Sequence, residues 1–193
     1  SNCKWPQNNP EYHPNNNIQK FNLDLEIIYQ TCTFSLNEIL VSSDQNTNGG
    51  ALTVKNSKVT FQSCTFSNNK SPQRKGGAIF CNPDDNDQVV TIKDCTFSGN
   101  VGQNGASIYS HGSNTKLIIK DTTFTSEGVH YIIVLENSNL EISKTTFANT
   151  NSYPIRFENV ADNTVQDIFF DNVKSNGSPL LFVENDLSFI NLT

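Results

Sequence analysis

Apolar and polar residues alternate in short runs along this chain, and one run recurs with its apolar positions kept. The clearest copy is residues 59–69, VTFQSCTFSNN. Val59 and Phe61 share one face of a first short strand, because successive side chains of a strand point to opposite faces. A polar pair then marks a bend, and Cys64 and Phe66 share the face of a second strand. Related copies occur at residues 31–37, 90–100, 117–124 and 140–147, with a degenerate one at 168–172.

A third short strand is predicted before each copy, at residues 49–54, 76–81, 105–109, 131–135, 154–157 and 180–183. One phenylalanine anchors each repeat: Phe34, Phe66, Phe97, Phe124, Phe147 and Phe170, at intervals of 32, 31, 27, 23 and 23 residues. Three strands in a repeat of this length match one coil of a parallel β-helix. We therefore predict an all-β fold, a single-stranded parallel β-helix of about seven coils with three short strands per coil.

Coils that stack at about 4.8 Å bring equivalent residues into ladders along the axis. The anchor phenylalanines form one ladder, and burial of each ring is expected to contribute about 1.5–3 kcal/mol. A second ladder contains Cys32, Cys64, Cys95, Thr122 and Thr145. A third, at the bend after the 49–54 strand and its equivalents, contains Asn56, Asn82, Asn137, Asn159 and Asn185.

Domain organisation follows from where the alternation begins. Residues 1–20 are rich in Asn and Pro without periodicity, so we predict an irregular N-terminal lead-in or cap. Residues 21–193 are predicted to be the β-helix, as part of a longer chain, because the last residues stop within a repeat. The net charge of -6 and the lack of basic patches argue against nucleic acid as a partner. No apolar run is long enough for membrane insertion by this segment.

Five cysteines, Cys3, Cys32, Cys64, Cys81 and Cys95, lack the spacing of a zinc site. Cys64 and Cys95 would stack in adjacent coils at a separation that suits a disulfide, but parallel side chains disfavour the required dihedral angle. A Cys64–Cys95 disulfide and a buried thiol ladder therefore both stay open, and a bond between Cys3 and Cys81 is a further alternative.

Three asparagines, Asn69, Asn176 and Asn191, begin triplets of the N-glycosylation pattern. Pro72 and Pro179 follow the first two triplets and weaken them. The triplets favour an extracellular or cell-surface localisation.

The acidic run of Asp84, Asp85 and Asp87 is the candidate metal site, for Ca²⁺, because carboxylate oxygens are the ligands that this ion takes. We favour the alternative of a solvated turn, since the run has turn composition. A hydrolase would need two carboxylates at a defined separation, which one short loop does not provide.

Glu136, Glu158 and Glu184 are predicted to stack as a column at one bend, with Arg156 beside them. A column of this kind is typical of a solvated edge, and cation binding is the alternative. His111 is interpreted as a bend histidine, because the paired aspartates of a polygalacturonase are missing from adjacent coils. No cofactor is expected.

Two motifs alternate along the first half of the chain. They are the F-x-x-N segments 34–37, 66–69 and 97–100 and the G-G-A segments 49–52 and 76–79. In these motifs, over residues 31 to about 109, the chain resembles the polymorphic outer membrane protein repeat. This resemblance implies a right-handed β-helix of the pectin-lyase-like kind at a cell surface, with a role in adhesion.

The function that we predict is that of a noncatalytic extracellular scaffold, a cell-surface or filament protein acting in adhesion or structural assembly. The expected partners are other protein chains or surface glycans, with end-to-end or lateral assembly as further possibilities. The alternative is a polysaccharide-active lyase or hydrolase of the pectin-lyase-like fold. An enzyme requires acidic and basic groups converging on one groove, whereas a scaffold requires only core ladders and polar sides.

Overall fold

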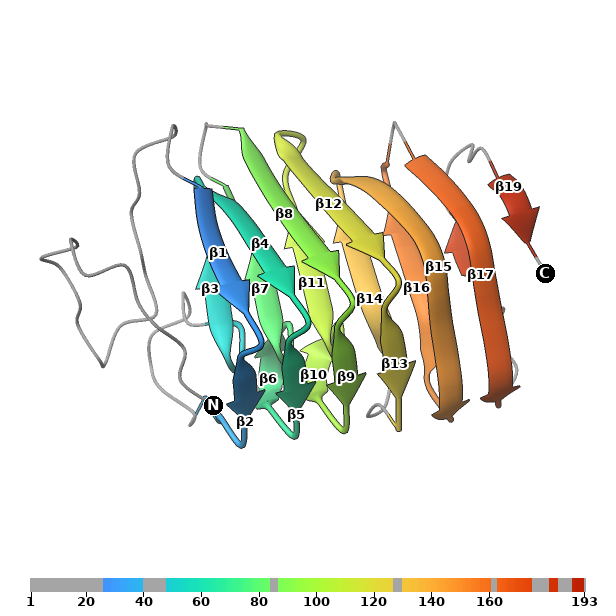
Figure 1. The fold of residues 1–193 in the computed structure, drawn as a ribbon, viewed down its shortest axis with the longest axis horizontal. Helices are drawn as coiled ribbons and strands as arrows, with labels where there is room; N and C mark the ends of the chain where they lie inside the picture. The colour runs from blue at the N-terminus through green and yellow to red at the C-terminus, as the bar shows by residue number, and fades with distance from the viewer. Residues whose placement is uncertain are drawn as a thin grey trace, which may run out of the picture.

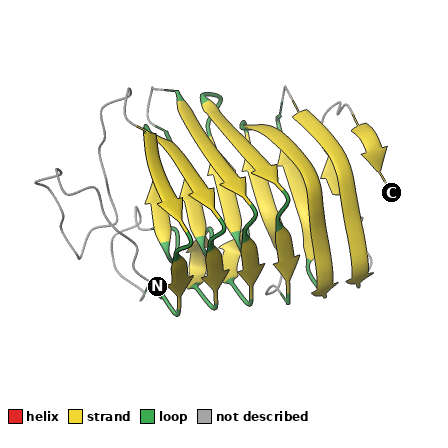
Figure 2. Cartoon of the chain, viewed as in Figure 1, coloured by secondary structure: helices red, strands yellow, loops and turns green. Residues whose placement is uncertain are grey.

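The structure is a computed structural model, which describes residues 26–39, 48–83, 87–126, 130–160 and 163–174, with the backbone alone for 181–183 and 189–192. Over these residues the chain forms β-strands and no helix (Figure 2). The coils stack along the long axis of the molecule in chain order (Figure 1). The predicted lead-in at residues 1–20 lies outside the described residues.

The largest sheet holds the first strand of each coil and, beyond a bend, the second. The first strands are β1 (Glu26–Gln30), β4 (Lys58–Gln62), β8 (Gln88–Lys93), β12 (Thr115–Lys120), β15 (Asn139–Thr150), β17 (Asn163–Val173) and β19 (Phe189–Leu192). The second strands are β2 (Thr33–Ser35), β5 (Thr65–Ser67), β9 (Thr96–Ser98) and β13 (Thr123–Thr125). All their pairings are parallel, and β15 and β17 continue through the bend as single long strands.

A left-handed residue makes this bend. Ser63 has a φ of 53° and Asp94 a φ of 53°, and each comes directly before the buried cysteine of its coil. Short polar residues tolerate this conformation better than bulky ones. Of the polar pair predicted to turn, Ser63 is therefore confirmed at the bend, whereas Gln62 is the last residue of β4.

A second sheet contains the strands predicted before each copy, in the order β18-β16-β14-β11-β7-β3. Their bounds are β3 (Leu52–Val54), β7 (Ile79–Cys81), β11 (Ile108–His111), β14 (Tyr131–Glu136), β16 (Tyr153–Glu158) and β18 (Leu181–Val183). A separate two-stranded sheet contains β6 (Lys70–Lys75) and β10 (Val101–Asn104). Along the chain, each of these strands follows a second strand of the largest sheet and precedes a strand of the second sheet. The all-β parallel β-helix is thus confirmed, while the number of about seven coils stays a prediction.

The two early coils that contain β6 and β10 carry a fourth strand each, in place of the three predicted. These strands account for much of the extra length of the early repeats. The register of the pair shifts between Gly102 and Asn104. Pro72 lies in the part of β6 opposite this shift, which is where a strand tolerates a residue that cannot donate a ladder hydrogen bond.

The G-G-A motif owes its glycines to two different demands. Gly76 has a φ of 69°, a conformation that side chains rarely adopt. At Gly77 an added Cβ would collide with the carbonyl oxygen of Ala106 in the next coil. One glycine therefore turns the chain, and the other lets adjacent coils approach.

The phenylalanine ladder is confirmed as the centre of the core. Phe66, Phe97, Phe124 and Phe147 are fully buried, and each sits in register with the next. The ring centroids from Phe34 to Phe147 are separated by 4.8, 4.6, 4.8 and 5.1 Å, in stacked orientation. Stacked pairs stabilise the fold by about 0.5–1.5 kcal/mol beyond the burial of their area.

The cysteine–threonine ladder is buried beside the phenylalanines, and its members make one recurring hydrogen bond. Cys95 Sγ donates to the carbonyl oxygen of Lys93 at 3.2 Å, and Thr122 Oγ1 donates to that of Lys120 at 2.9 Å. A thiol and a hydroxyl therefore satisfy the same carbonyl two residues earlier. This shared geometry explains why threonine replaces cysteine in the later coils.

Among the described cysteines, Cys64, Cys81 and Cys95 are free and buried, whereas Cys32 is disulfide-bonded. The thiol-ladder alternative is therefore confirmed for Cys64 and Cys95. The alternative bond between Cys3 and Cys81 is wrong, because Cys81 is a free thiol. Burial raises the pKa of Cys81 to about 12, so its thiol stays protonated.

The predicted asparagine ladder needs one correction. Asn56, Asn137 and Asn159 occupy left-handed positions with φ of 51°, 55° and 52°. Asn82 does not join them. Cys81 is in register with Ser110, so Asn82 lies level with His111. His111 is in register with Glu136, which comes one residue before Asn137. Pro83, two residues after the Val54–Cys81 pair, lies level with Asn56 instead. Asn185 lies outside the described residues.

Candidate functional site

The outward face of the second sheet carries an apolar cluster of its own. Along β7 the side chains of Ile79 and Cys81 enter the core, so Phe80 points outward. Phe80 is in register with Tyr109 of β11, which is in register with Val134 of β14. These three outward residues are nevertheless only 7%, 3% and 3% exposed.

A cleft of ≈ 440 Å³ borders this cluster at Phe80, and its volume is in the usual range for ligand sites. One wall comes from the ends of β6 and β10, which contribute Gln73, Arg74, Lys75, Gln103 and Asn104. The remaining lining residues are Asn48, Phe80, Asn82 and His111, from the ends of β7 and β11 and the turn before β3. The fourth strand of the early coils therefore builds one side of the cleft.

Charged and phenolic groups meet at the edge of this cleft. Lys75 Nζ donates to Tyr109 Oη at 2.6 Å and lies 4.3 Å from the centre of the tyrosine ring. It also pairs with Glu136 Oε2 at 3.4 Å. The Tyr109 hydroxyl in turn donates to Glu136. Residues from β6, β11 and β14 thus form one charge-assisted network across three coils.

His111 completes this network. Its Nδ1 lies 3.5 Å from Glu136 Oε2. Burial first, and the positive charge of Lys75 second, hold the pKa of His111 below its ordinary value. The imidazole is therefore neutral near neutral pH. The interpretation as a bend histidine is wrong, because His111 is the last residue of β11, and it has polar neighbours that the sequence did not indicate.

The predicted glutamate column is confirmed for Glu136 and Glu158, which are in register, while Glu184 lies outside the described residues. Each carboxylate pairs with a cation instead of standing as a solvated edge. Arg156 Nε lies 2.6 Å from Glu158 Oε1, and its guanidinium lies 5.6 Å from the ring centre of Tyr131. The expectation that Arg156 neutralises part of the column is thereby confirmed.

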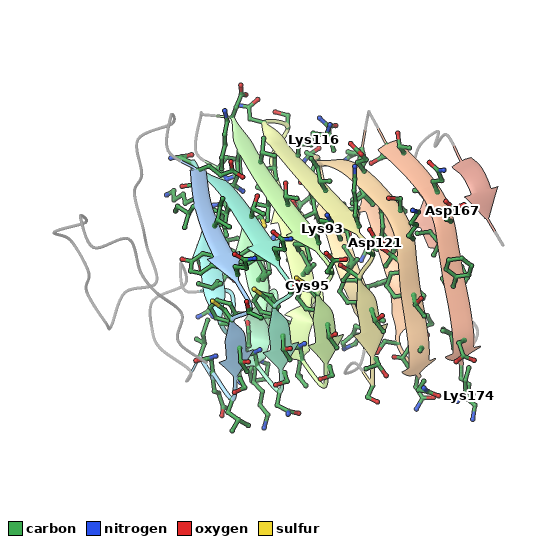
Figure 3. All side chains as sticks on the ribbon, in the orientation of Figure 1. Lys93, Cys95, Lys116, Asp121, Asp167 and Lys174 are labelled. Carbon is green, nitrogen blue, oxygen red and sulfur yellow. The ribbon has the colours of Figure 1, made fainter. Side chains whose placement is uncertain are left out.

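The opposite face, on the first sheet, carries ion pairs of a simpler kind. Glu141 Oε1 lies 2.7 Å from Lys120 Nζ, and Glu141 Oε2 lies 3.3 Å from Lys116 Nζ. Figure 3 places Lys116 at the start of β12 and Asp121 just beyond its end, on this face. The hydrogen bond from Lys120 is the main reason that the pKa of Glu141 is lowered. Such half-exposed pairs contribute little to stability.

The proposed Ca²⁺ ligands are only partly described. Asp87 is exposed, whereas Asp84 and Asp85 lie outside the described residues. Across the residues that the structure describes, no three His, Cys, Asp or Glu side chains are grouped so that they could hold a metal ion. The described part of the chain also has no helix long and apolar enough to span a membrane.

Asn69 belongs to a buried amide ladder that was not foreseen. Its Nδ2 donates to Asn100 Oδ1 at 2.9 Å and to the carbonyl oxygen of Phe34 at 3.0 Å. Its Oδ1 accepts from Asn37 Nδ2 at 2.8 Å. Recurrence of asparagine three residues after the first three anchor phenylalanines was the signal for this ladder in the sequence.

The ladder argues against the predicted glycosylation at Asn69. The side chain is fully buried and both Nδ2 hydrogens are engaged, so a glycan would require the coil to open. Of the other two glycosylation candidates, Asn176 lies outside the described residues, and only the backbone of Asn191 is described.

Two family models match this chain. The right-handed beta helix region matches residues 77–191, and the Chlamydia polymorphic membrane protein repeat matches residues 63–82. The second match contains the F-x-x-N segment 66–69 and the G-G-A segment 76–79, so the resemblance inferred from these motifs is confirmed. No curated protein and no solved structure matches the chain.

Proposed function

This chain belongs to the right-handed β-helix family, and on that premise we propose that it is a noncatalytic extracellular scaffold of a cell-surface or filament protein, acting in adhesion or structural assembly. Each coil is expected to contribute one first strand to the largest sheet. The first strands of that sheet, from β1 to β19, therefore support the proposed number of about seven coils. The match to the Chlamydia polymorphic membrane protein repeat supports the surface location.

The phenylalanine ladder is the observation that carries this proposal. It runs without a break from Phe34 to Phe170, with every neighbouring pair of rings stacked. Close-packed cores of this kind deform little. The outward row of the second sheet, by contrast, changes from coil to coil, from Phe80 to Tyr109 to Val134. A rigid body with variable sides is suited to presenting a lateral binding surface to other protein chains or to surface glycans.

Cell-binding beads test this proposal. Beads coated with the folded protein are incubated with cells, and bound beads are counted beside beads coated with the heat-unfolded protein. The proposal predicts binding by the folded protein alone, or concentration-dependent association of the protein with itself in sedimentation. A folded protein that neither binds cells nor self-associates would refute the proposal.

A second candidate function is a polysaccharide-active lyase or hydrolase of the pectin-lyase-like fold. The observation that favours it is the network of Lys75, Tyr109, Glu136 and His111, because general acid–base catalysis uses such groups at hydrogen-bonding distance. Incubation with polysaccharides, followed by assays for new reducing ends and unsaturated products, discriminates the two candidates. The scaffold proposal predicts no turnover above that of the Glu136→Gln variant.

A further inference from the structure

We propose that the cleft over β7 and β11 is a binding site for an oligosaccharide. The inference rests on the proposed function as a surface scaffold and names the ligand class that this surface recognises. It is carried by the chemistry of the cleft lining, by the charge balance within it, and by the way in which its walls are fixed.

Primary amides dominate the lining. Gln73 and Gln103 come from the neighbouring strands β6 and β10, and Asn48, Asn82 and Asn104 add three more amides. Each amide group offers two donor hydrogens and an acceptor oxygen on one plane. Vicinal sugar hydroxyls, which donate and accept at short intervals, match that arrangement. A peptide partner would instead favour an apolar centre larger than the single ring of Phe80.

Two cations, Arg74 and Lys75, line the cleft, and Lys75 is already paired before any ligand binds. Lys75 is paired with Glu136 and bonded to Tyr109, and the lowered pKa of His111 leaves its imidazole neutral. Among the residues that the structure describes, no carboxylate side chain lines the cleft, in a chain whose net charge is -6. The site therefore does not repel uronate sugars, and it does not require an anionic ligand either. Recognition through hydroxyl groups fits both cases.

The aromatic floor supplies the apolar part of sugar recognition. Phe80 and Tyr109 are stacked with ring centroids 5.8 Å apart, and Phe80 lines the cleft. The face of an aromatic ring carries partial negative charge and attracts the C–H groups of a pyranose. A small exposed ring area among amides is suited to one or two sugar rings rather than to a lipid or an apolar side chain.

Preorganisation favours binding at this place. The Asn48 side-chain oxygen accepts from the backbone N–H of Lys75 at 3.1 Å, which ties the turn before β3 to β6. The Lys75 side chain is itself held by Tyr109 and Glu136 from two further coils. Walls that are ordered before binding reduce the entropy lost on association.

Two glutamine pairs allow a matched test. Gln73→Ala combined with Gln103→Ala removes two amides from the cleft. Gln30→Ala combined with Gln62→Ala removes two amides that are in register on β1 and β4, away from the cleft. The wild type and both double variants are first compared by thermal unfolding, to verify that each is folded. Binding is then measured on a printed panel of neutral and uronate-containing oligosaccharides, followed by calorimetric titration with the strongest binder.

The proposal predicts that at least one oligosaccharide binds the wild type, and that the cleft variant binds it about tenfold more weakly, which corresponds to about two lost hydrogen bonds. The β1/β4 variant should bind like the wild type. Neutral binders would indicate hydroxyl recognition alone, and a preference for uronates would add a charge contribution from the cationic wall. Absence of any binder, or equal affinity of both double variants, would overturn the inference. If the cell-binding beads still adhere in that case, the proposed function stands and only the inference fails.

Discussion

Replacing Phe97 by alanine removes the central ring of the core ladder. Phe97 is fully buried, and its ring centroid lies 4.6 Å from that of Phe66 and 4.8 Å from that of Phe124. Backbone hydrogen bonds fix the spacing between neighbouring coils, so the space left by the ring cannot close completely. The substitution therefore creates a cavity that breaks the stack into two halves.

The expected loss can be worked from these contacts. Truncation of a buried phenylalanine to alanine costs about 3–5 kcal/mol. That range already includes part of the two stacked ring contacts, each of which contributes about 0.5–1.5 kcal/mol. We expect Phe97→Ala to lower the free energy of unfolding by about 4 kcal/mol, a large fraction of the stability of an ordinary domain.

Urea titration followed by circular dichroism measures this loss. Phe169→Ala is the matched control, because Phe169 lies on the outward face of β17, opposite to Phe170, and is 48% exposed. The control should change the unfolding free energy by about 0.5 kcal/mol. If Phe97→Ala were no more destabilising than Phe169→Ala, the stacked ladder would not be the core of this fold.

Three further substitutions address the site and its surroundings. Asn69→Ala should destabilise the protein by about 1–3 kcal/mol for each buried group left unpaired, as measured in urea, and mass spectrometry of the secreted protein should find Asn69 without a glycan. Lys75→Gln should raise the pKa of His111 in a proton NMR titration, because Lys75 lowers it; in the wild type the unfolded state binds the histidine proton more readily, so this residue reduces stability as the pH falls through its ordinary value of 6.5. Glu141→Gln should cost about 0.5 kcal/mol at neutral pH, since the pair is partly exposed; the stabilisation by this carboxylate is present above its ordinary pKa of 4.5 and is lost as the pH falls further, so wild type and variant should unfold alike in strong acid. A stability difference for Glu141→Gln that persists in strong acid would contradict the ion-pair explanation.

The core could be predicted from the sequence because successive coils place the same types of residue at the same buried positions. Once Phe66 and Phe97 are recognised as equivalent, parallel stacking places their neighbours in register without further information. The G-G-A motif is equally local, since the demands on Gly76 and Gly77 arise within one coil and the coil beside it. Most of the fold could therefore be predicted from residues that recur at periodic positions.

The cleft could not be predicted in the same way, because its walls come from residues without a period. β6 reads KSPQRK, which is polar throughout and contains a proline, so no alternation marks it as a strand. Its pairing with β10 depends on the stacking of the coils. Asn82 was misplaced by one residue because the position level with Asn56 is occupied by Pro83 in that coil, and a proline there does not continue the asparagine pattern.

Contacts between aromatic rings of successive coils test the central claim of this account, the in-register parallel stack. In the protein with isotope-labelled phenylalanine, assigned by single Phe→Leu substitutions, nuclear Overhauser effects report which rings are close neighbours. The structure predicts contacts from Phe66 to Phe97, from Phe97 to Phe124 and from Phe124 to Phe147, whose ring centroids lie 4.6, 4.8 and 5.1 Å apart. It predicts none between Phe66 and Phe124, which are two coils apart. Missing neighbour contacts, or contacts that skip a coil, would contradict the stack and with it the cleft built on that stack.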